Sequence, residues 1–458
     1  MISARAMPYL AAGAAGAGVG LAVSAQAPLL RAAPVLAIAS VGALGLAFSG
    51  GRWALGLLMV APFFPIPFRA AGAVIGPPDI AVLLVLLGWA GHMLARGRVV
   101  VPRTSGDWAI AMLVTATAAS ALAVALMPGP VPLGASVKKV AQLSLSFVGL
   151  YYFAAYAGRE PRALRSAVAV FLALSALEAA YAVLLQSLPA LMGGTGLWPP
   201  YLAARASARA MGTVDAAFGH YMAAALALAL VIAMQERGRL RKLAAGAVPV
   251  LLAGLISSGT RGSVVAAGAG VVALIIFSRR RRVLLAGVGG SAVAMGLVGL
   301  LWPRILAPEG IAFLFTSHGS SSLAVRMLSW RVGWDLAIAH PWLGLGPGAN
   351  ALTVEVLLGL PVEALRYVEG TMNAYLQAFL ETGVLGLVAL VGFIAVVSGR
   401  ALLAGARGSS LALGLGAAVL VLGVTGFTGP LLIGGIGHLL FALAGLAAAA
   451  TPAKREAS

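Results

Sequence analysis

The sequence contains no cysteine, and only 13 of its 458 residues are acidic. The absence of cysteine excludes a disulfide framework, a thiolate nucleophile and a cysteine-ligated metal site. Charged residues make up 10% of the chain, whereas an ordinary soluble domain has about 25%. So low a charge content, together with a mean hydropathy of +1.00, excludes a soluble globular fold.

Hydrophobic residues, by contrast, form 61% of the chain and gather in repeated long runs. A run of about 20 apolar residues is long enough to cross a bilayer as a helix. The sequence therefore predicts an all-α integral membrane protein, a polytopic bundle of about 12–14 transmembrane helices. Spans are expected near residues 8–25, 32–49, 53–70, 78–96, 107–127, 139–157, 164–186, 214–235, 241–257, 262–278, 283–302, 378–398, 411–427 and 429–449.

One long passage interrupts the apolar pattern. Residues 303–371 contain five of the 13 acidic residues and are too polar to cross lipid. We expect this passage to contain the functional site of the protein. The predicted organisation is N-terminal transmembrane helices (1–200), a transmembrane core with Arg209 and Arg261 (201–302), one large periplasmic loop domain (303–377) and C-terminal transmembrane helices (378–458).

The net charge of +18 follows from arginine and lysine. In a soluble protein such a charge would indicate a nucleic-acid partner, but in a membrane protein basic residues gather in cytoplasmic loops. With both termini placed in the cytoplasm, 20 of the 31 basic residues fall on the cytoplasmic side, and the run Arg279–Arg282 marks that face. The loop of residues 303–371 then faces outward, and no nucleic-acid partner is expected.

Four of the outward arginines come from three separate segments. They are Arg209, Arg261, Arg326 and Arg331. Any one of them could extend to lipid headgroups or lie at the end of a helix. As a set they predict a shared anion site, because the planar guanidinium matches a phosphate with two parallel hydrogen bonds.

Two helix starts are predicted beside these arginines. A helix is expected to begin at Ser322 as N-cap and to end before Pro341, with Arg326 and Arg331 on opposite edges of its apolar stripe. Only one of the two arginines should then point into the loop cavity. A second helix is expected to begin at Asn373, with Tyr375 facing the bundle.

Five motifs, in this order, resemble the O-antigen ligase and O-antigen polymerase superfamily. They are R-x-M-G-T-x-D at 209–215 with FGHY after it, SGTRG at 258–262, S-S-S-L-x-x-R-x-x-x-W at 320–330, HPWLGLGPG at 340–348 and N-x-Y-L-Q-x-x-x-E-T-G-x-x-G at 373–386. The resemblance covers roughly residues 200–390. It implies a GT-C-like membrane glycosyltransferase of the bacterial inner membrane, with its active face in the periplasm.

The resemblance also implies a reaction. Such proteins transfer a glycan from undecaprenyl diphosphate to a lipid or glycan acceptor, such as lipid A-core or a growing polysaccharide. Arginines at positions 209, 261 and 326 would bind the diphosphate, with Arg331 as a fourth candidate, and Arg261 would also stabilise the leaving group. No cofactor is expected, and the absence of a His and Asp/Glu cluster in the sequence favours arginines in place of a metal ion.

One position departs from the family pattern. Where the ligases have a histidine as the expected base, directly before the asparagine of the last motif, this chain has Met372. Methionine cannot accept a proton. Glu369, His340 and His318 are the nearest alternative bases, although His340 could instead orient the turn at Pro341. Two other interpretations of Met372 are a polymerase-like member with a different arrangement and an inactive form of the enzyme. Supporting roles are expected for Asp215, Met372, Asn373 and Tyr375.

A different class of function is a transporter or flippase of a polyprenyl-linked glycan, or a solute permease. Permeases commonly show internal repeats and broken helices at mid-membrane. This sequence shows no such duplication, and its polar residues gather in one outward loop, which favours the enzyme. The sequence favours neither ligase nor polymerase, and it does not indicate the sugars.

Overall fold

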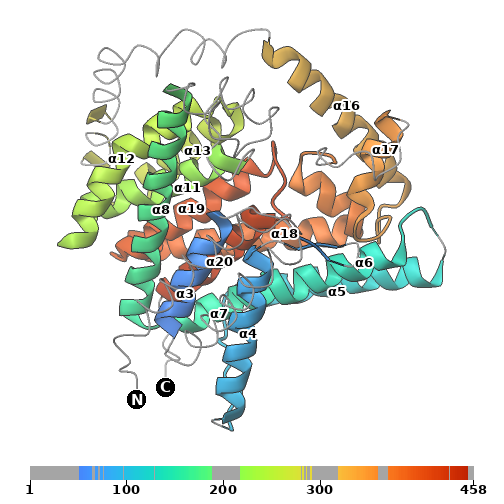
Figure 1. Ribbon diagram of the computed structural model, residues 1–458, viewed down its shortest axis with the longest axis horizontal. Coiled ribbons are helices and arrows are strands. Elements are labelled where there is room, and N and C mark those ends of the chain that lie inside the picture. The colour runs from blue at the N-terminus through green and yellow to red at the C-terminus, as the bar shows by residue number, and fades with distance from the viewer. Residues whose placement is uncertain are drawn as a thin grey trace, which may run out of the picture.

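The computed structural model describes residues 51–63, 68–70, 73–75, 77–95, 97–127, 129–187, 217–279, 281–282, 285, 289–290, 318–358, 370–432 and 434–451. These residues form a helical bundle (Figure 1). In chain order its helices are α3 (Gly51–Val60), α4 (Pro77–Ala95), α5 (Asp107–Leu126), α6 (Leu133–Ala141), α7 (Leu150–Ala157), α8 (Pro161–Ser187), α11 (Phe218–Gln235), α12 (Arg239–Ser257), α13 (Arg261–Phe277), α16 (His318–Ala339), α17 (Leu352–Leu358), α18 (Ala374–Ala406), α19 (Ser410–Thr425) and α20 (Gly434–Ala450). The prediction of an all-α membrane fold is confirmed.

Seven spans of the described chain are long and apolar enough to cross a membrane. They are Pro78–Ala95, Asp107–Leu126, Leu133–Ala157, Pro161–Leu184, Phe218–Gln235, Arg239–Ser257 and Ala374–Ala406. Shorter apolar helices at Gly51–Phe63, Arg261–Phe277, Ser410–Thr425 and Gly434–Ala450 complete the bundle. The spans expected at 8–25 and 32–49, and most of the span at 283–302, lie outside the described residues.

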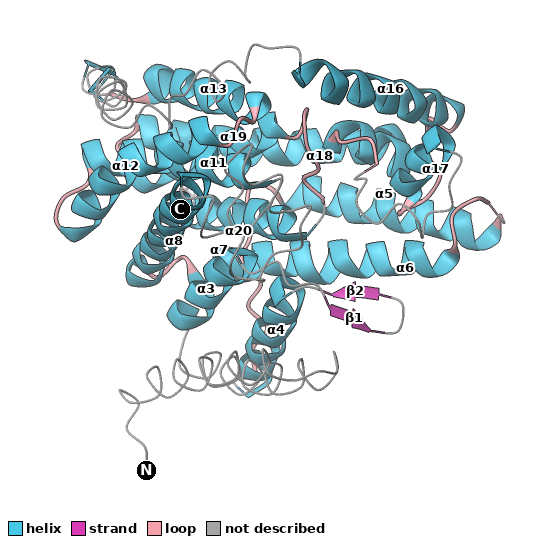
Figure 2. Ribbon diagram, turned by 45° about the horizontal axis from the view of Figure 1, so that its top comes forward, coloured by secondary structure: helices cyan, strands magenta, loops and turns pink. Residues whose placement is uncertain are grey.

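Helix α11 occupies the centre of the bundle. Every residue from Phe218 to Ile232 is buried, as expected for a helix that is apolar on all sides. It packs against α12, α13 and α19, and α19 in turn packs against α18 (Figure 2). The N-terminus of α13 is therefore held close to the turn that follows α19.

A column of aromatic rings joins helices α7, α18 and α20. Phe147 stacks on Phe441 with ring centroids 5.3 Å apart, and Phe393 stacks on the same Phe441 at 5.1 Å. Tyr151 meets the edge of Phe393 at 5.3 Å. Burial and ring contact together fix α7, α18 and α20 against one another.

The helix predicted at 53–70 is shorter than expected. Helix α3 ends at Val60, a 3₁₀ turn (η1, Ala61–Phe63) follows, and two short antiparallel strands, β1 (Phe68–Ala70) and β2 (Ala73–Ile75), form a hairpin. Their register pairs Phe68 with Ile75 and Ala70 with Ala73. Prolines within the sequence PFFPIPF lack the amide hydrogen that a continuing helix requires, which explains the early end.

The span expected at 139–157 begins earlier, at Leu133, and it is not a regular helix throughout. Between α6 and α7 the segment Gln142–Gly149 (η2) is π-helical. A π-helical turn lengthens the hydrogen-bonded ring by one residue and is found frequently at functional sites. This segment re-aims the side chains of Gln142 and Phe147 relative to α6.

Helix α18 contains a break at Gly383, where φ is 69°. The break frees two carbonyls: Leu380 O accepts from the amide of Leu345 at 2.8 Å, and Glu381 O accepts from Ser120 Oγ at 2.7 Å. The amide of Val384 donates to Pro341 O at 2.8 Å. The glycine-rich turn of HPWLGLGPG is thus fixed to the first part of α18 by backbone hydrogen bonds.

Candidate active site

The turn between α19 and α20, residues 426–432, connects several of the predicted site segments; we call it the hub turn. Arg326 of α16 is half-buried and donates a hydrogen bond to the carbonyl of Thr428 in this turn. Gly262, the residue after Arg261, lies directly against the side chain of Thr428. The helices that carry Arg326 and Arg261 therefore meet at one residue.

The N-terminus of α13 lies at this meeting point. Thr260 occupies the N-cap position with an extended backbone, and Arg261 is the first helical residue, with its side chain exposed. The first amides of a helix have no partner within the helix, and the helix dipole makes this end positive. A helix N-terminus with an arginine on it and a second arginine beside it is suited to bind a phosphate group.

We call the place where α13, α16 and the hub turn meet the corner at Thr428. A buried histidine contacts two of these segments. His220 of α11 is 4% exposed, and its Nδ1 lies 2.6 Å from Ser263 Oγ in the first turn of α13. On the other side of the ring, Gly429 of the hub turn approaches so closely that a Cβ there would lie 2.6 Å from Nε2. His220 therefore fixes α13 relative to the hub turn.

The start of α18 reaches the hub turn as well. The side chain of Asn373 caps the helix, accepting from the amides of Tyr375 and Leu376 at 3.0 Å each. The amide of Ala374 donates to Gly426 O at 2.8 Å, and the Tyr375 ring lies 4.5 Å from that of Phe427. The predicted N-cap at Asn373 is confirmed.

Met372, just before this cap, has a left-handed backbone with a φ of 48°. Non-glycine residues rarely adopt this conformation, and such strain persists only where neighbouring contacts impose it. Here the contacts come from Asn350, whose Oδ1 accepts from the amide of Thr371 at 2.9 Å and whose side chain packs on Gly370. Asn350 thus fixes the turn that contains the unusual residue.

Several predicted residues lie elsewhere. Arg331 is exposed and stands about 140° around the axis of α16 from Arg326, so the two do not converge. His340 is exposed just beyond the other end of α16, roughly 21 Å from Arg326 at the helical rise. An imidazole there does not reach a group bound at Arg326.

The side chains of the remaining predicted residues lie outside the described part of the chain. Arg209, Asp215 and Glu369 lie outside the described residues. His318 is the first residue of α16, and its side chain also lies outside the described part. Helix α16 begins there rather than at Ser322, and it ends at Ala339, before Pro341 as predicted.

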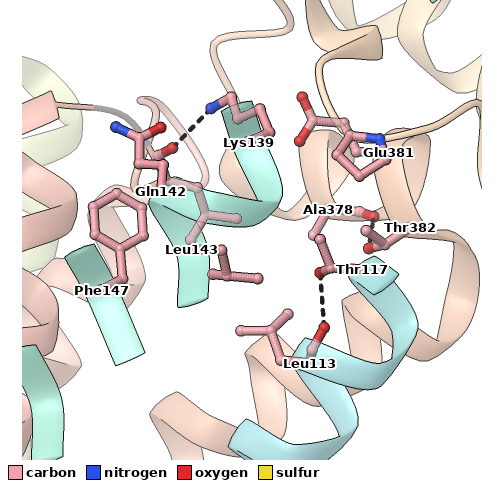
Figure 3. Close-up of a pocket in the computed structure, with 11 residues that line it drawn as sticks. Leu113, Thr117, Lys139, Gln142, Leu143, Phe147, Ala378, Glu381 and Thr382 are labelled. Atoms are coloured by element: carbon pink, nitrogen blue, oxygen red, sulfur yellow. Dashed lines mark hydrogen bonds between the residues drawn. The ribbon is translucent and has the colours of Figure 1, made fainter. Parts of the chain in front are cut away.

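A pocket opens next to the hub turn on the side of α5 and α6 (Figure 3). Its polar lining consists of Thr117, Lys139, Gln142, Glu381 and Thr382, and Pro347 and Leu432 also border it. The amino group of Lys139 donates to Leu432 O at 3.1 Å. The pocket and the corner at Thr428 therefore share the hub turn between them.

A comparison with protein families matches residues 245–391 to a family described as O-antigen ligase. This region of the chain is similar to the O-antigen ligase family, which supports the resemblance to the O-antigen ligase and polymerase superfamily. A comparison with curated protein sequences found no match.

The matched region contains Arg261, Arg326 and the start of α18, but the complete corner extends beyond it. Thr428 and His220 lie outside the matched residues, as do Lys139 and Gln142 of the pocket. The signal that could have indicated Lys139 is its position among outward basic residues, which topology does not require. Among the described residues, no three His, Asp or Glu side chains gather as metal ligands would.

Proposed function

We propose that the protein transfers a glycan from undecaprenyl diphosphate to a lipid or glycan acceptor on the periplasmic face of the bacterial inner membrane. The observation that carries the proposal is the corner at Thr428, where the helices of Arg261 and Arg326 meet at the N-terminus of α13. The similarity of residues 245–391 to the O-antigen ligase family supports the reaction class.

In this proposal the diphosphate of the donor lies against the first turn of α13. Arg326 donates to the carbonyl of Thr428, which fixes this arginine beside the first turn of α13, and Arg261 is exposed at the helix start. The planar guanidinium matches a phosphate with two parallel hydrogen bonds. Arg209 would approach from the segment before α11. Arg331 takes no part, because it faces away from this corner.

The catalytic contribution of these groups is positioning and charge stabilisation. As the bond between the anomeric carbon and the phosphate oxygen breaks, negative charge accumulates on the lipid diphosphate. Fixed guanidinium groups and helix amides placed at that charge stabilise the transition state without reorganising. Since arginines supply this charge, we expect turnover to be independent of divalent cations.

The test is a transfer assay on the full chain in lipid nanodiscs, with a polyprenyl-diphosphate oligosaccharide as donor and EDTA present. Arg326→Ala is expected to reduce donor binding and transfer by about 100-fold or more, since removal of a buried charged partner typically costs 2–5 kcal/mol. Arg407→Ala, an exposed arginine at the opposite end of α18, is the matched control and should behave as the parent.

The products separate the possible outcomes. A ladder of glycans indicates polymerisation, and a single transfer to a distinct acceptor indicates ligation. Movement of the intact donor across the bilayer without bond cleavage would instead favour a transporter. Equal transfer by the parent and by Arg326→Ala would contradict the proposed diphosphate site.

A further inference from the structure

The pocket beside the hub turn is built from two irregular elements. Gln142, Leu143 and Phe147 come from the π-helical segment η2, and Glu381 and Thr382 directly precede the break of α18 at Gly383. π-helical segments occur frequently at functional sites. In a membrane, irregular backbone is tolerated where it is buried in protein or lines a cavity.

Glu381 is the most unusual group in the pocket. Its side chain is only 6% exposed, although burial of a carboxylate without compensation is costly. Gln377 Nε2 donates to its Oε1 at 3.2 Å, and the amide of Asn350 donates to the same atom at 3.4 Å. Within the described part of the chain, its side-chain hydrogen bonds involve Oε1 alone, so Oε2 is the oxygen available to the pocket.

The cation of the pocket does not neutralise this carboxylate. Lys139 directs its amino group to the carbonyl of Leu432, and Figure 3 shows that group on the side away from Glu381. The ion pairs of the described residues do not include Glu381. The pocket therefore offers a free carboxylate oxygen, an amide at Gln142 and an ammonium, separated by apolar walls of Leu113, Leu143 and Phe147.

The pocket lies near a membrane surface. Val384, directly after the break, and Arg400 are 16 residues apart in α18, roughly 24 Å at the helical rise. Glu381 lies on the far side of the break, so the segment from Glu381 to Arg400 spans most of the ~30 Å hydrocarbon core. If Arg400 marks one surface, Glu381 lies near the other. That is the surface at which α16 and the start of α18 meet the hub turn.

Two features connect the pocket to the corner at Thr428. Leu432 and Thr428 belong to the same short turn, so the two sites are within about 14 Å along the chain. In addition, Glu381 contacts the amide of Asn350, whose side chain fixes Thr371 beside Met372. A ligand that spans the hub turn would touch both sites.

We infer that this pocket binds a hydroxyl-bearing edge of the acceptor sugar and that Glu381 accepts the proton of the attacking hydroxyl. Carboxylate, amide and ammonium groups on apolar walls match the alternating hydroxyls and carbon faces of a sugar. The acceptor oxygen bonds to the anomeric carbon of the donor, its proton passes to Glu381 Oε2, and the lipid diphosphate leaves with the electron pair. Glu381 thus supplies the base that Met372 cannot supply. The inference rests on the proposed function.

The test measures acceptor kinetics and donor binding separately, with the full chain in nanodiscs. Glu381→Gln should lower kcat by about 100-fold or more, the usual contribution of a general base, while the donor Kd stays within about twofold of the parent. Lys139→Met should raise the acceptor KM about tenfold, the loss of one charge-assisted hydrogen bond. Glu355→Gln, a partly exposed carboxylate of α17 outside the pocket, is the control and should match the parent.

Transfer by Glu381→Gln within about threefold of the parent, well below a general base's contribution, would overturn the inference, as would an unchanged acceptor KM in Lys139→Met. If Glu381→Gln has a lowered melting temperature, the acceptor KM of Lys139→Met is the deciding measurement. These failures differ from failure of the proposed function. If the proposed function were wrong, the parent itself would not cleave the donor, or Arg326→Ala would bind the donor as tightly as the parent does.

Discussion

Several side chains at this site are fixed by hydrogen bonds to neutral groups. Arg326 is held by the carbonyl of Thr428, Asn373 by amides of its own helix, and His220 by Ser263. A guanidinium carries a full positive charge and matches an anionic phosphate with two parallel hydrogen bonds. The arrangement therefore suits a phosphate that arrives from outside.

The cap of α18 gives a prediction at this scale. Asn373→Ala removes two hydrogen bonds to helix amides and should lower the free energy of unfolding by about 1 kcal/mol, the usual value of an N-cap. Because α18 begins at the hub turn, the variant should also lose transfer activity. Thermal melting and the transfer assay together test this.

Ser409→Ala provides the comparison, because Ser409 caps α19 away from the hub turn by accepting from Ala412. It should lower the melting temperature similarly and leave activity intact. Equal activity in both variants would indicate that the start of α18 does not contribute to the site.

At the scale of the elements, glycines set the distances between helices. Gly262 permits the contact of α13 with Thr428, and Gly383 permits the approach of Trp342 to α18. Both positions lie in motifs that the sequence singled out, SGTRG and E-T-G-x-x-G. The contacts show why a side chain larger than hydrogen does not fit there.

Gly262→Ala tests the meeting of α13 with the hub turn. The added Cβ would overlap the side chain of Thr428, so the turn must move, at a cost of about 1–3 kcal/mol for overpacking. We expect a lower melting temperature and a loss of donor binding, measured with the labelled donor in nanodiscs.

Gly268→Ala in the same helix is the matched control, because its Cβ would meet open space. In a helix interior this change should raise stability by about 0.5–1 kcal/mol and leave donor binding unchanged. If Gly262→Ala bound donor as well as Gly268→Ala does, the contact with Thr428 would not matter for the site.

At the scale of the whole molecule, most of the fold could be predicted from the sequence and much of the site could not. Long apolar runs predict helices such as α5, α8 and α12 to within a few residues, because the bilayer sets their length. Local motifs also indicate Arg261, Arg326 and the cap at Asn373. Sequence periodicity does not reveal the π-helical η2, the break at Gly383 or the contact between Glu381 and Asn350, because each depends on packing between distant segments.

The orientation of the molecule is open to a direct test, since the chain has no cysteine of its own. Ala339→Cys, exposed at the end of α16, should react with a membrane-impermeant maleimide added to spheroplasts, because we expect that end to face the periplasm. Arg407→Cys, exposed beyond α18, should react only after the membrane is permeabilised. The reverse pattern would place the proposed site in the cytoplasm and contradict the topology.

The most direct test of the central claim is a cryo-electron microscopy structure of the protein in nanodiscs with a polyprenyl-diphosphate glycan bound. The account predicts density for the diphosphate between Arg326, Arg261 and the first turn of α13, with the glycan directed toward the hub turn and Glu381. Density for the diphosphate at another place, with this corner unchanged from the unbound protein, would contradict it.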